Sequence, residues 1–366
     1  MNILQVISST RASGAERHFV LLARNLRDLG HRVIVACPPG GWLSCQLDQA
    51  AIRVVPLCMR GPAAPLAVLT LRSIVRQECC ELVHTHLTRA TYLGYFAGIA
   101  SRIPVVSTVH IWSRDLAYRR LPGGNHWLVA VSDYMRQSLI SRGVAPARVV
   151  TVYNGTDLLA VGAESIGESP EANLSVSAEF GLPADAIVVG SIGHVDEFKG
   201  QPLLVEAAPL VLRNCPNTYL LFVGYVDPRI QQALWKRAAD LGVADRLRFA
   251  GVRNDIPRLL KSMAVVALPS RTEACSMSII EAMAMGRPVV ATRAGGNPEL
   301  VEHGVTGLLT NRTPQSLAEA LSVILTNSSL RARMGAAGRQ RAAALFSASA
   351  MAENMVSLYS RVLGHA

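Results

Sequence analysis

The sequence predicts an α/β protein made of two doubly wound domains in tandem. Short apolar, β-branched runs alternate with stretches of helical length and pattern, and this alternation stops and then restarts once along the chain. The chain has 366 residues, which is long for a single hydrophobic core. Because alternating strands and helices form a parallel sheet covered on both faces, we expect one such sheet in each half.

The N-terminal domain is expected to span residues 1–157. Its first strand, Ile3–Ile7, leads through a small polar loop into a helix over Gly14–Leu29, an order that opens a Rossmann-like unit. Gly14 is the only glycine near that loop, so the GxGxxG pattern of dinucleotide-binding proteins is absent. The further strands predicted in this half are Arg32–Cys37, Arg53–Leu57, Leu82–His84, Val105–Val109, Leu128–Val131 and Val149–Val152.

A turn signal at residues 154–157, Asn-Gly-Thr-Asp, ends the first series. Residues 158–182 are expected to form a linker, because the periodic pattern there gives way to Gly, Ser, Glu, Pro and Ala. The second domain should span residues 183–347. Its predicted strands are Ile187–Ile192, Tyr219–Val223, Leu247–Ala250, Val265–Leu268, Val289–Ala291 and Gly307–Leu309, and its last helices are 314–327 and 330–345, before a final helix over 348–363.

The composition excludes several classes of protein. Half of the residues are hydrophobic and 17% are charged, so disorder is not expected. No apolar run approaches the roughly 18 residues that span a bilayer, and the first residues do not resemble a signal peptide. The seven cysteines have no metal-ligand spacing, which favours free thiols in a reducing cytoplasm.

The positive charge is concentrated in the N-terminal half. Residues 1–157 carry 17 Arg and 8 acidic residues, a net charge of +9, whereas residues 158–366 carry +1. No nucleic-acid-binding motif accompanies this charge, so a nucleic-acid partner is not expected. Two interpretations stay open: a solvated arginine-rich surface, or a surface that meets an anionic membrane or an acidic acceptor.

Residues 269–299 read as a loop, a helix, a turn and a strand, directly after a buried strand. Glu273 lies in the loop and Glu281 in the helix predicted over Met277–Met285. A helix start preceded by small residues offers free N–H groups to a phosphate. Carboxylates on either side would suit hydroxyl-rich groups, so the pattern indicates a nucleotide-sugar site.

Glu273 and Glu281 could also be a hydrolytic pair. Eight helical residues would separate them by roughly 12 Å along the axis. Glycosidase carboxylates lie about 5–9.5 Å apart. We therefore expect two separate sugar contacts.

Lys199 follows the first strand of the second domain, in the loop Gly193–Gly200. It is one of 3 lysines against 33 arginines in the chain. A compact ammonium at a strand end can hold a diphosphate as a point charge, although a solvated surface lysine is the alternative.

Taken together, these stretches resemble the retaining glycosyltransferases of the GT-B fold, family 4. The segment EACSMSIIEAMAMGRPVVAT matches the family's Glu-x7-Glu motif, and RAGGNPELVEHGVTGLL continues it. SGAERH resembles the family's Gly-Gly-Ala-Glu loop, and VHTHL, STVH, VAVSDYM and VYNGTD follow in the family's order. The resemblance covers almost the whole chain.

The resemblance implies two Rossmann-like domains facing across a cleft, with the helix in residues 348–366 crossing back to the N-terminal domain. Glu281 would bind the ribose, Glu273 the donor sugar and Lys199 the diphosphate. His110 would lie beside the reacting sugar, whereas His86 is interpreted as structural. The catalytic residues implied are Glu273, His110 and Lys199, and the donor-binding residues are Gly14, His194, Lys199, Cys275, Ser276, Met277 and Glu281, with no metal ligands.

One position departs from the family pattern. Where the family has an arginine five residues before the lysine, this chain has His194. Histidine is mostly neutral at pH 7 and lacks the bidentate fork of arginine. We expect His194 still to donate to the phosphate.

The implied function is that of a retaining, metal-independent hexosyltransferase without a cofactor. It would move a sugar from a UDP-, GDP- or ADP-sugar to a glycan or lipid-linked acceptor in cell-surface polysaccharide or lipopolysaccharide synthesis. The expected location is the cytoplasm, free or peripheral on the inner face of the plasma membrane. The segment 110–121, with Trp112, Tyr118 and several arginines, could lie on such a membrane. Two alternatives stay open: a nucleotide-sugar-binding homologue with weak or no transfer, and a nucleotide-sugar epimerase of the same architecture.

Overall fold

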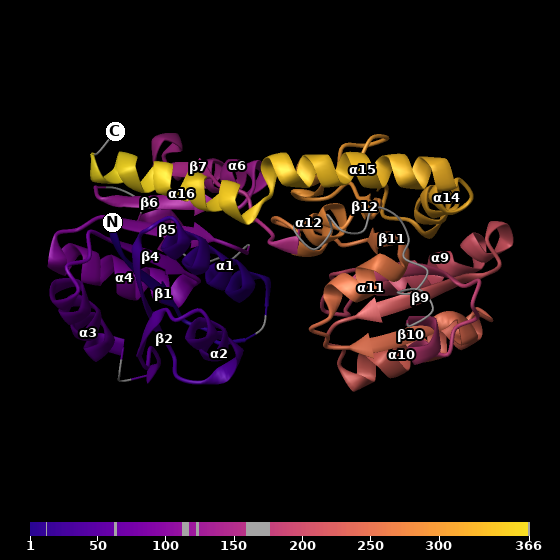
Figure 1. The fold of residues 1–366 in the computed structure, drawn as a ribbon, viewed down its shortest axis with the longest axis horizontal. Helices are drawn as coiled ribbons and strands as arrows, with labels where there is room; N and C mark the ends of the chain where they lie inside the picture. The colour runs from indigo at the N-terminus through magenta and orange to yellow at the C-terminus, as the bar shows by residue number, and fades with distance from the viewer. Residues whose placement is uncertain (12, 62–63, 112–116, 122–123, 159–175, 365–366) are drawn as a thin grey trace. The chain divides into compact units, whose positions relative to one another are not determined.

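The computed structural model describes residues 1–11, 13–61, 64–111, 117–121, 124–158 and 176–364. The chain divides into two compact units. Met1–Gly155 and Ala348–Ala366 form the N-terminal unit, and Thr156–Ser347 form the C-terminal unit. Each unit contains a parallel sheet between helices (Figure 1), so the prediction of two doubly wound α/β domains is confirmed. Of the expected linker, residues 159–175 lie outside the described residues.

The N-terminal unit has seven strands in the order β3-β2-β1-β4-β5-β6-β7, all parallel. The strands are β1 (Asn2–Ile7), β2 (Arg32–Cys37), β3 (Arg53–Pro56), β4 (Leu82–His86), β5 (Val105–Val109), β6 (His126–Ala130) and β7 (Val149–Thr151). The helices are α1 (Gly14–Asp28), α2 (Gly41–Gln49), α3 (Ala64–Gln77), α4 (Thr88–Ser101), α5 (Ala117–Arg120), α6 (Asp133–Ser141) and α16 (Ala348–Leu363).

Successive strand residues point to opposite sides of this sheet, and side chains on both sides are buried. Ile3 and Ile7 belong to a core cluster that includes Phe19 of α1, whereas Leu4 and Val6 belong to a second cluster that contains residues of α3 and α4. The continuous apolar runs of the sequence reflect this double burial.

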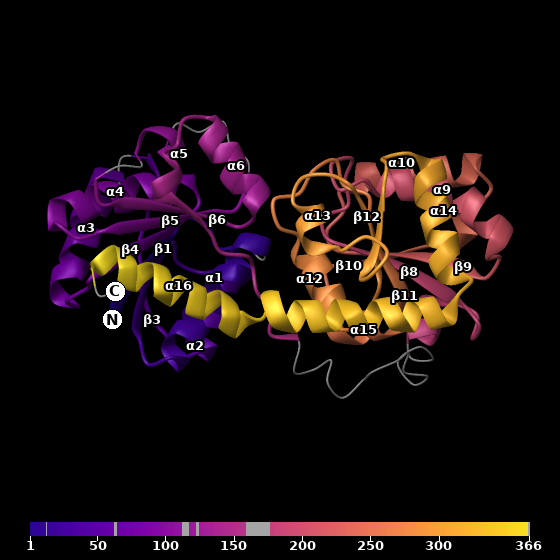
Figure 2. The same cartoon turned by 90° about the horizontal axis from the view of Figure 1, so that it is seen from above.

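Helix α16 packs against α1 within the N-terminal unit, as both views show (Figure 2). Its buried face includes Met351, Met355 and Tyr359. The hydroxyl of Tyr359 lies 2.6 Å from Nδ1 of His84. The last helix therefore belongs to the first domain, as the resemblance implied.

The C-terminal unit has six parallel strands in the order β10-β9-β8-β11-β12-β13. The strands are β8 (Ile187–Ile192), β9 (Thr218–Val223), β10 (Leu247–Gly251), β11 (Met263–Leu268), β12 (Val289–Thr292) and β13 (Gly307–Thr310). The helices are α9 (Gln201–Asn214), α10 (Pro228–Asp240), α11 (Ile256–Ser262), α12 (Met277–Ala284), α13 (Asn297–Leu300), α14 (Pro314–Leu325) and α15 (Ser328–Leu345).

Three predicted strand boundaries are wrong by two residues. Strand β4 continues to His86, β6 begins at His126 rather than at Leu128, and β11 begins at Met263 rather than at Val265. The criterion of apolar runs excluded these histidines, yet parallel pairing carries the strands through them, with His86 opposite Thr108 and His126 opposite Val105.

None of the described helices combines the length and apolar character needed to cross a bilayer. The seven cysteines, all of which are described, are free thiols.

Candidate functional site

Two loops of the C-terminal unit follow neighbouring strands at the point where the strand order reverses. Residues 193–200 follow β8, and residues 269–276 follow β11, and these strands pair at the centre of the sheet. Open parallel sheets bind ligands beyond the carboxyl ends of such strands. The topology therefore brings the two sequence motifs to the same place.

Lys199 and Glu273 form a salt bridge between these loops. The Nζ atom of Lys199 lies 2.8 Å from Oε1 and 2.9 Å from Oε2 of Glu273. Ser270 Oγ donates to Oε1 of the same carboxylate at 2.8 Å. The Glu273 side chain is 8% exposed and that of Lys199 28%. The pair is thus held close to the surface, with the lysine more accessible than the carboxylate.

Backbone contacts fix the two loops against each other. The N–H of Arg271 donates to the carbonyl of Phe198 at 2.8 Å. Gly200 has φ +82°, and a Cβ built on it would lie 2.0 Å from the carbonyl oxygen of Pro269. Such a close approach of two backbones requires glycine.

A second glycine holds the backbone of Glu273 from the other side. Gly295, in the turn after β12, has φ +57°, and its Cβ would lie 2.1 Å from the Glu273 carbonyl oxygen. The N–H of Gly296 donates to that oxygen at 2.8 Å. Glu273 is thus positioned by backbone contacts from the Gly-Gly turn as well as by its salt bridge.

Helix α12 begins directly after this loop. Ser276 is its N-cap, and its side chain accepts from the N–H of Ile279. Cys275 and Ser276 are buried, whereas Met277 and Glu281 keep part of their surface accessible. The start of the helix therefore lies beside the loop of Glu273, with a capped first turn.

Glu273 and Glu281 are not joined by a continuous helix. Helix α12 begins at Met277 after its N-cap Ser276, so Glu273 lies in the preceding loop. The axial distance of roughly 12 Å expected for eight helical residues therefore does not apply to this pair.

His194 lies in the loop after β8 and is exposed. Its ring packs against Tyr225, with 4.9 Å between the ring centroids. The ring is therefore oriented by an aromatic neighbour while its surface stays accessible to a ligand.

In the N-terminal unit, Gly14 is the first residue of α1 and is exposed. Ser13 is the N-cap residue, and its hydroxyl donates to the carboxylate of Glu16. A serine at the cap with a glutamate three residues later is the sequence pattern of a capping box. Here the serine side chain bonds the Glu16 carboxylate and makes no cap hydrogen bond to the backbone of the helix.

His110, placed directly after β5, is part of a cluster of four histidines. Its Nε2 lies 3.0 Å from Nδ1 of His86, and its ring lies 4.8 Å from that of His18. The His84 ring is 4.2 Å from the His86 ring. The sequence pattern favoured a structural role for His86 and gave no role to His18 or His84. The sequence could have indicated that His84 and His86 lie together, since residues two apart in a strand point to the same face of the sheet.

Burial keeps this cluster neutral. Desolvation lowers the pKa of His18 to about 4 and the pKa values of His84, His86 and His110 well below 6.5. Within the described part of the chain, no carboxylate offsets this burial in the four cases. The rings are therefore neutral at pH 7.

The segment 110–121 is described only in part, since residues 112–116, and with them Trp112, lie outside the described residues. Tyr118, expected at a membrane interface, is 5% exposed. The expectation for Tyr118 is wrong, because the first turn of α5 packs the ring into the unit.

Two family models match the chain: "Glycosyltransferase Family 4" over residues 12–158 and "Glycosyl transferases group 1" over residues 184–327. The D-inositol 3-phosphate glycosyltransferase of Mycobacteroides abscessus is 31% identical over 328 residues, which are 81% of this chain and 69% of the relative. The GDP-mannose-dependent alpha-(1-6)-phosphatidylinositol monomannoside mannosyltransferase of Mycobacterium tuberculosis is 30% identical over 290 residues, 76% of this chain and 69% of the relative. For two further relatives the match spans only 64% and 66% of the relative's own length.

Among solved structures, HepE of Anabaena in complex with UDP has a TM-score of 0.86 at 27% identity, over 99% of this chain and 100% of that chain. The two α/β units of this chain agree with the similarity to that structure over the whole chain. The chain belongs to glycosyltransferase family 4, the glycosyl transferases group 1, and has the GT-B fold.

Proposed function

We propose that this protein transfers a sugar from a nucleoside-diphosphate sugar to a hydroxyl group of a glycan or lipid-linked acceptor, with retention at the anomeric carbon. The salt bridge between Lys199 and Glu273 is the observation that carries the proposal. A diphosphate that approaches Lys199 exchanges one anionic partner for another. Glu273 then becomes free to accept from hydroxyls of the donor sugar.

In the proposed reaction, the bond from the anomeric carbon to the leaving phosphate oxygen breaks, and the diphosphate takes the electron pair. The acceptor oxygen forms its bond on the same face of the sugar, and the hydroxyl proton passes to the leaving diphosphate. Negative charge builds up on that diphosphate. Its stabilisation by preorganised donors is therefore the main catalytic effect.

The donor contacts proposed for the C-terminal unit follow from its two loops. Lys199 and His194 would hold the diphosphate, and the backbone of Cys275, Ser276 and Met277 would meet it or the sugar. Glu281, on the accessible side of α12, would bind the ribose hydroxyls. Because an ammonium and a helix start balance the phosphate charge, the proposed reaction needs no metal ion at the diphosphate and no cofactor.

The relatives suggest which donors to try first. The structure of HepE was solved with UDP, and the relative from Mycobacterium tuberculosis is named as GDP-mannose-dependent. We propose UDP-glucose and GDP-mannose as the first candidates, followed by ADP-glucose.

The first experiment is a thermal-shift screen with these three donors on the full chain. The donor that raises the melting temperature is then incubated with an acceptor mixture, and release of nucleoside diphosphate is followed together with the anomeric coupling of the product by NMR. A product with the donor's own configuration supports the proposal, and an inverted product contradicts it.

Donor release without acceptor separates the alternatives. Slow hydrolysis of the bound donor supports a transferase. Binding of the donor without its release, with or without acceptor, supports the binding-only homologue. That alternative was raised because His194 stands where the family has an arginine. Conversion of the donor into its epimer would support the epimerase.

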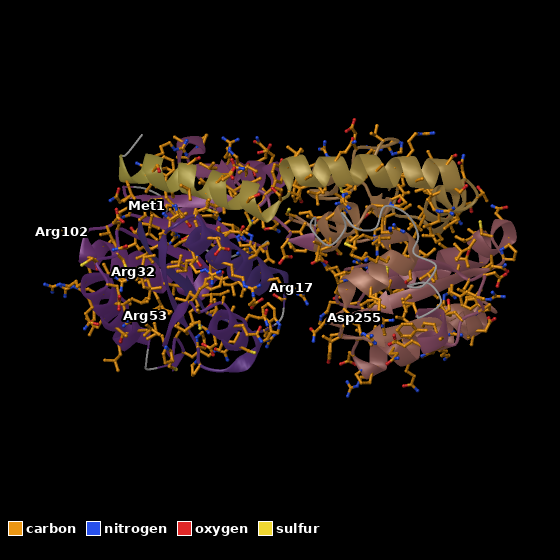
Figure 3. All side chains as sticks on the ribbon, viewed as in Figure 1. Met1, Arg17, Arg32, Arg53, Arg102 and Asp255 are labelled. Carbon is orange, nitrogen blue, oxygen red and sulfur yellow. The ribbon has the colours of Figure 1, made fainter. Side chains whose placement is uncertain are left out.

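Helices α3 and α4 favour a lipid-linked acceptor. They pack against each other and expose Leu66, Leu69, Phe96 and Ile99, each more than half exposed. Neither helix contains an acidic residue. Exposed arginines lie on both helices, and a further one, Arg102, follows α4 directly (Figure 3). Apolar side chains among arginines suit an anionic lipid surface. We propose that the protein associates peripherally with the cytoplasmic face of the membrane and glycosylates a precursor of a surface glycan there.

Vesicle co-sedimentation tests the membrane proposal. The native protein should sediment with vesicles that contain phosphatidylglycerol at low salt, less so at high salt, and not with phosphatidylcholine alone. The Leu66→Ser/Leu69→Ser variant should lose this binding. The matched control, Val252→Ser/Val323→Ser, removes two exposed apolar side chains of the C-terminal unit and should bind as the native protein does. Equal binding of both variants would contradict the proposed surface.

A further inference from the structure

The histidine cluster of the N-terminal unit contains a group with metal-ligand geometry. His18 comes from α1, His86 is the last residue of β4, and His110 follows β5. One ring nitrogen of each lies within 4.8 Å of those of the other two. Among the described residues this is the one group of three or more possible ligands found so close together. Three elements distant in the sequence thus bring three imidazoles to one point beside β1 and β4, where the strand order reverses.

The hydrogen bonds of the fourth histidine differ from those of this group. His84 uses both ring nitrogens, Nε2 with Thr108 Oγ1 at 2.7 Å and Nδ1 with the Tyr359 hydroxyl at 2.6 Å. In contrast, neither ring nitrogen of His18 has a hydrogen bond of normal geometry within the described part of the chain, and the polar group that approaches it is Asn154.

His86 likewise has one buried ring nitrogen, Nε2, that finds no hydrogen-bond partner in the regions that the structure describes. Its Nδ1 faces Nε2 of His110 at 3.0 Å. Buried polar atoms without partners are uncommon and costly. A neutral imidazole has one N–H and one nitrogen with a lone pair, so His18 and His86 can each offer one lone pair to a ligand.

The chemistry of these donors selects the class of ion. Neutral imidazole nitrogens suit zinc and similar transition metals, whereas magnesium and calcium prefer oxygen ligands. Three histidines with one open position form a known type of zinc site. Zn–N bonds of about 2.0–2.1 Å place the nitrogens roughly 3.3 Å apart, so binding would draw the rings together by about an ångström.

We propose that His18, His86 and His110 bind one divalent transition-metal ion of the zinc class. Binding joins α1 to the ends of β4 and β5 and leaves one coordination position open. The site lies in the N-terminal unit, whereas the diphosphate contacts proposed above lie in the C-terminal unit. A further consequence rests on the proposed function and on the role that the family resemblance implies for His110: an imidazole bound to a metal ion would no longer be available to the reacting sugar, so the metal-loaded protein would be the inhibited form.

Metal retention by the full chain is the direct test. The protein is stripped with a chelator, loaded with Zn²⁺ and dialysed, and the ratio of zinc to protein is measured. We expect one ion per native chain. His18→Asn and His86→Gln should each weaken binding by roughly 100-fold or more, since the loss of even an outer partner of a ligand costs about 10–100-fold.

His84→Gln is the matched control. It replaces a histidine that is equally buried on the same strand face but whose nitrogens are already engaged, so this variant should retain the ion. Melting curves recorded with EDTA show that each variant is folded. If His18→Asn retains zinc as the native chain does, or if the folded native chain retains none, the inference is wrong.

Cobalt separates histidine ligands from cysteine ligands. Co²⁺ at three imidazoles gives visible absorption without a thiolate charge-transfer band in the near ultraviolet. Such a band would place the ion on the exposed thiols of Cys45, Cys58 or Cys79 and would overturn the proposal.

The inhibition can be tested separately. Zn²⁺ should suppress sugar transfer by the native chain, EDTA should restore it, and His18→Asn should be less sensitive. A native chain that transfers sugar but binds no Zn²⁺ when loaded would refute this inference alone. A native chain that binds Zn²⁺ but, once stripped of it, is inactive with every donor would refute the proposed function alone.

Discussion

At the scale of single residues, the salt bridge between Lys199 and Glu273 combines a structural effect with the proposed catalytic one. The carboxylate is nearly buried, and its remaining partner is Ser270. Removing one member of a buried pair leaves the other charge uncompensated. Because Lys199 is 28% exposed, water can replace part of the lost interaction.

Lys199→Ala should therefore destabilise the C-terminal unit by about 1–2 kcal/mol and should lower transfer by roughly 100–1000-fold. Adding Glu273→Gln should restore much of the stability, because no unpaired charge is left, but none of the activity. Urea unfolding and initial rates measure the two effects. Lys236→Ala, at an exposed lysine of α10, is the control and should change neither.

His194→Arg should tighten donor binding by about fivefold, because a charged donor bonds a phosphate about 1 kcal/mol more strongly than a neutral one. Titration calorimetry with the donor measures the affinity of both proteins. Unchanged affinity would place His194 away from the diphosphate.

At the scale of elements, the loops 193–200 and 269–276 are positioned by backbone contacts rather than by side-chain packing alone. The carbonyl of Pro269 occupies the space that a side chain at position 200 would need. The two loops can therefore lie this close only because position 200 is a glycine. The geometry of the salt bridge between Lys199 and Glu273 depends on this short distance.

Gly200→Ala should destabilise the C-terminal unit by about 3 kcal/mol, of which about 1 kcal/mol comes from the positive φ and the rest from the clash. Donor affinity should fall as well, since Lys199 moves with the loop. Gly242→Ala is the matched control: its φ is +68°, but nothing lies within 4 Å of the added Cβ. This control should cost only about 1 kcal/mol and leave donor affinity unchanged. Equal losses in the two variants would mean that the loops do not need their close approach.

At the scale of the whole molecule, the two units differ in their histidines. Among the described residues, six histidines belong to the N-terminal unit, and two, His194 and His303, are exposed in the C-terminal unit. Burial lowers the pKa of His126, which bonds Ser107 at 2.8 Å, to about 4. The unfolded chain, in which the pKa is near 6.5, therefore binds more protons than the folded chain between these values.

Acid should consequently weaken the N-terminal unit first. The stability that neutral His126 contributes is complete above pH 6.5 and is lost as the pH falls toward 4, about 2 kcal/mol of it by pH 5. In Trp235→Phe, every remaining tryptophan belongs to the N-terminal unit, so its fluorescence in urea reports that unit. His126→Gln in this background should reduce the loss between pH 7 and pH 5. An acid sensitivity that the substitution leaves unchanged would show that His126 titrates normally.

The sequence by itself determined the fold class, most strand positions and the helix start beside Glu273. These features depend on local periodicity, caps and turn residues, which a single chain displays directly. The length of β4 and the start of β6 were missed because histidines interrupt the apolar runs that reveal a buried strand.

Only the tertiary structure decided which distant residues meet. Lys199 forms its salt bridge with Glu273, which lies 74 positions further along the chain, and the backbone of Gly200 lies against the carbonyl of Pro269. His18, His86 and His110 come together from a helix and two strand ends. Contacts of this kind have no period in the sequence. They follow from the strand order, which brings the carboxyl ends of β8 and β11, or of β1 and β4, to the same edge of a sheet. For this reason the sequence named most of the candidate residues, while their pairing, and the histidine cluster, required the fold.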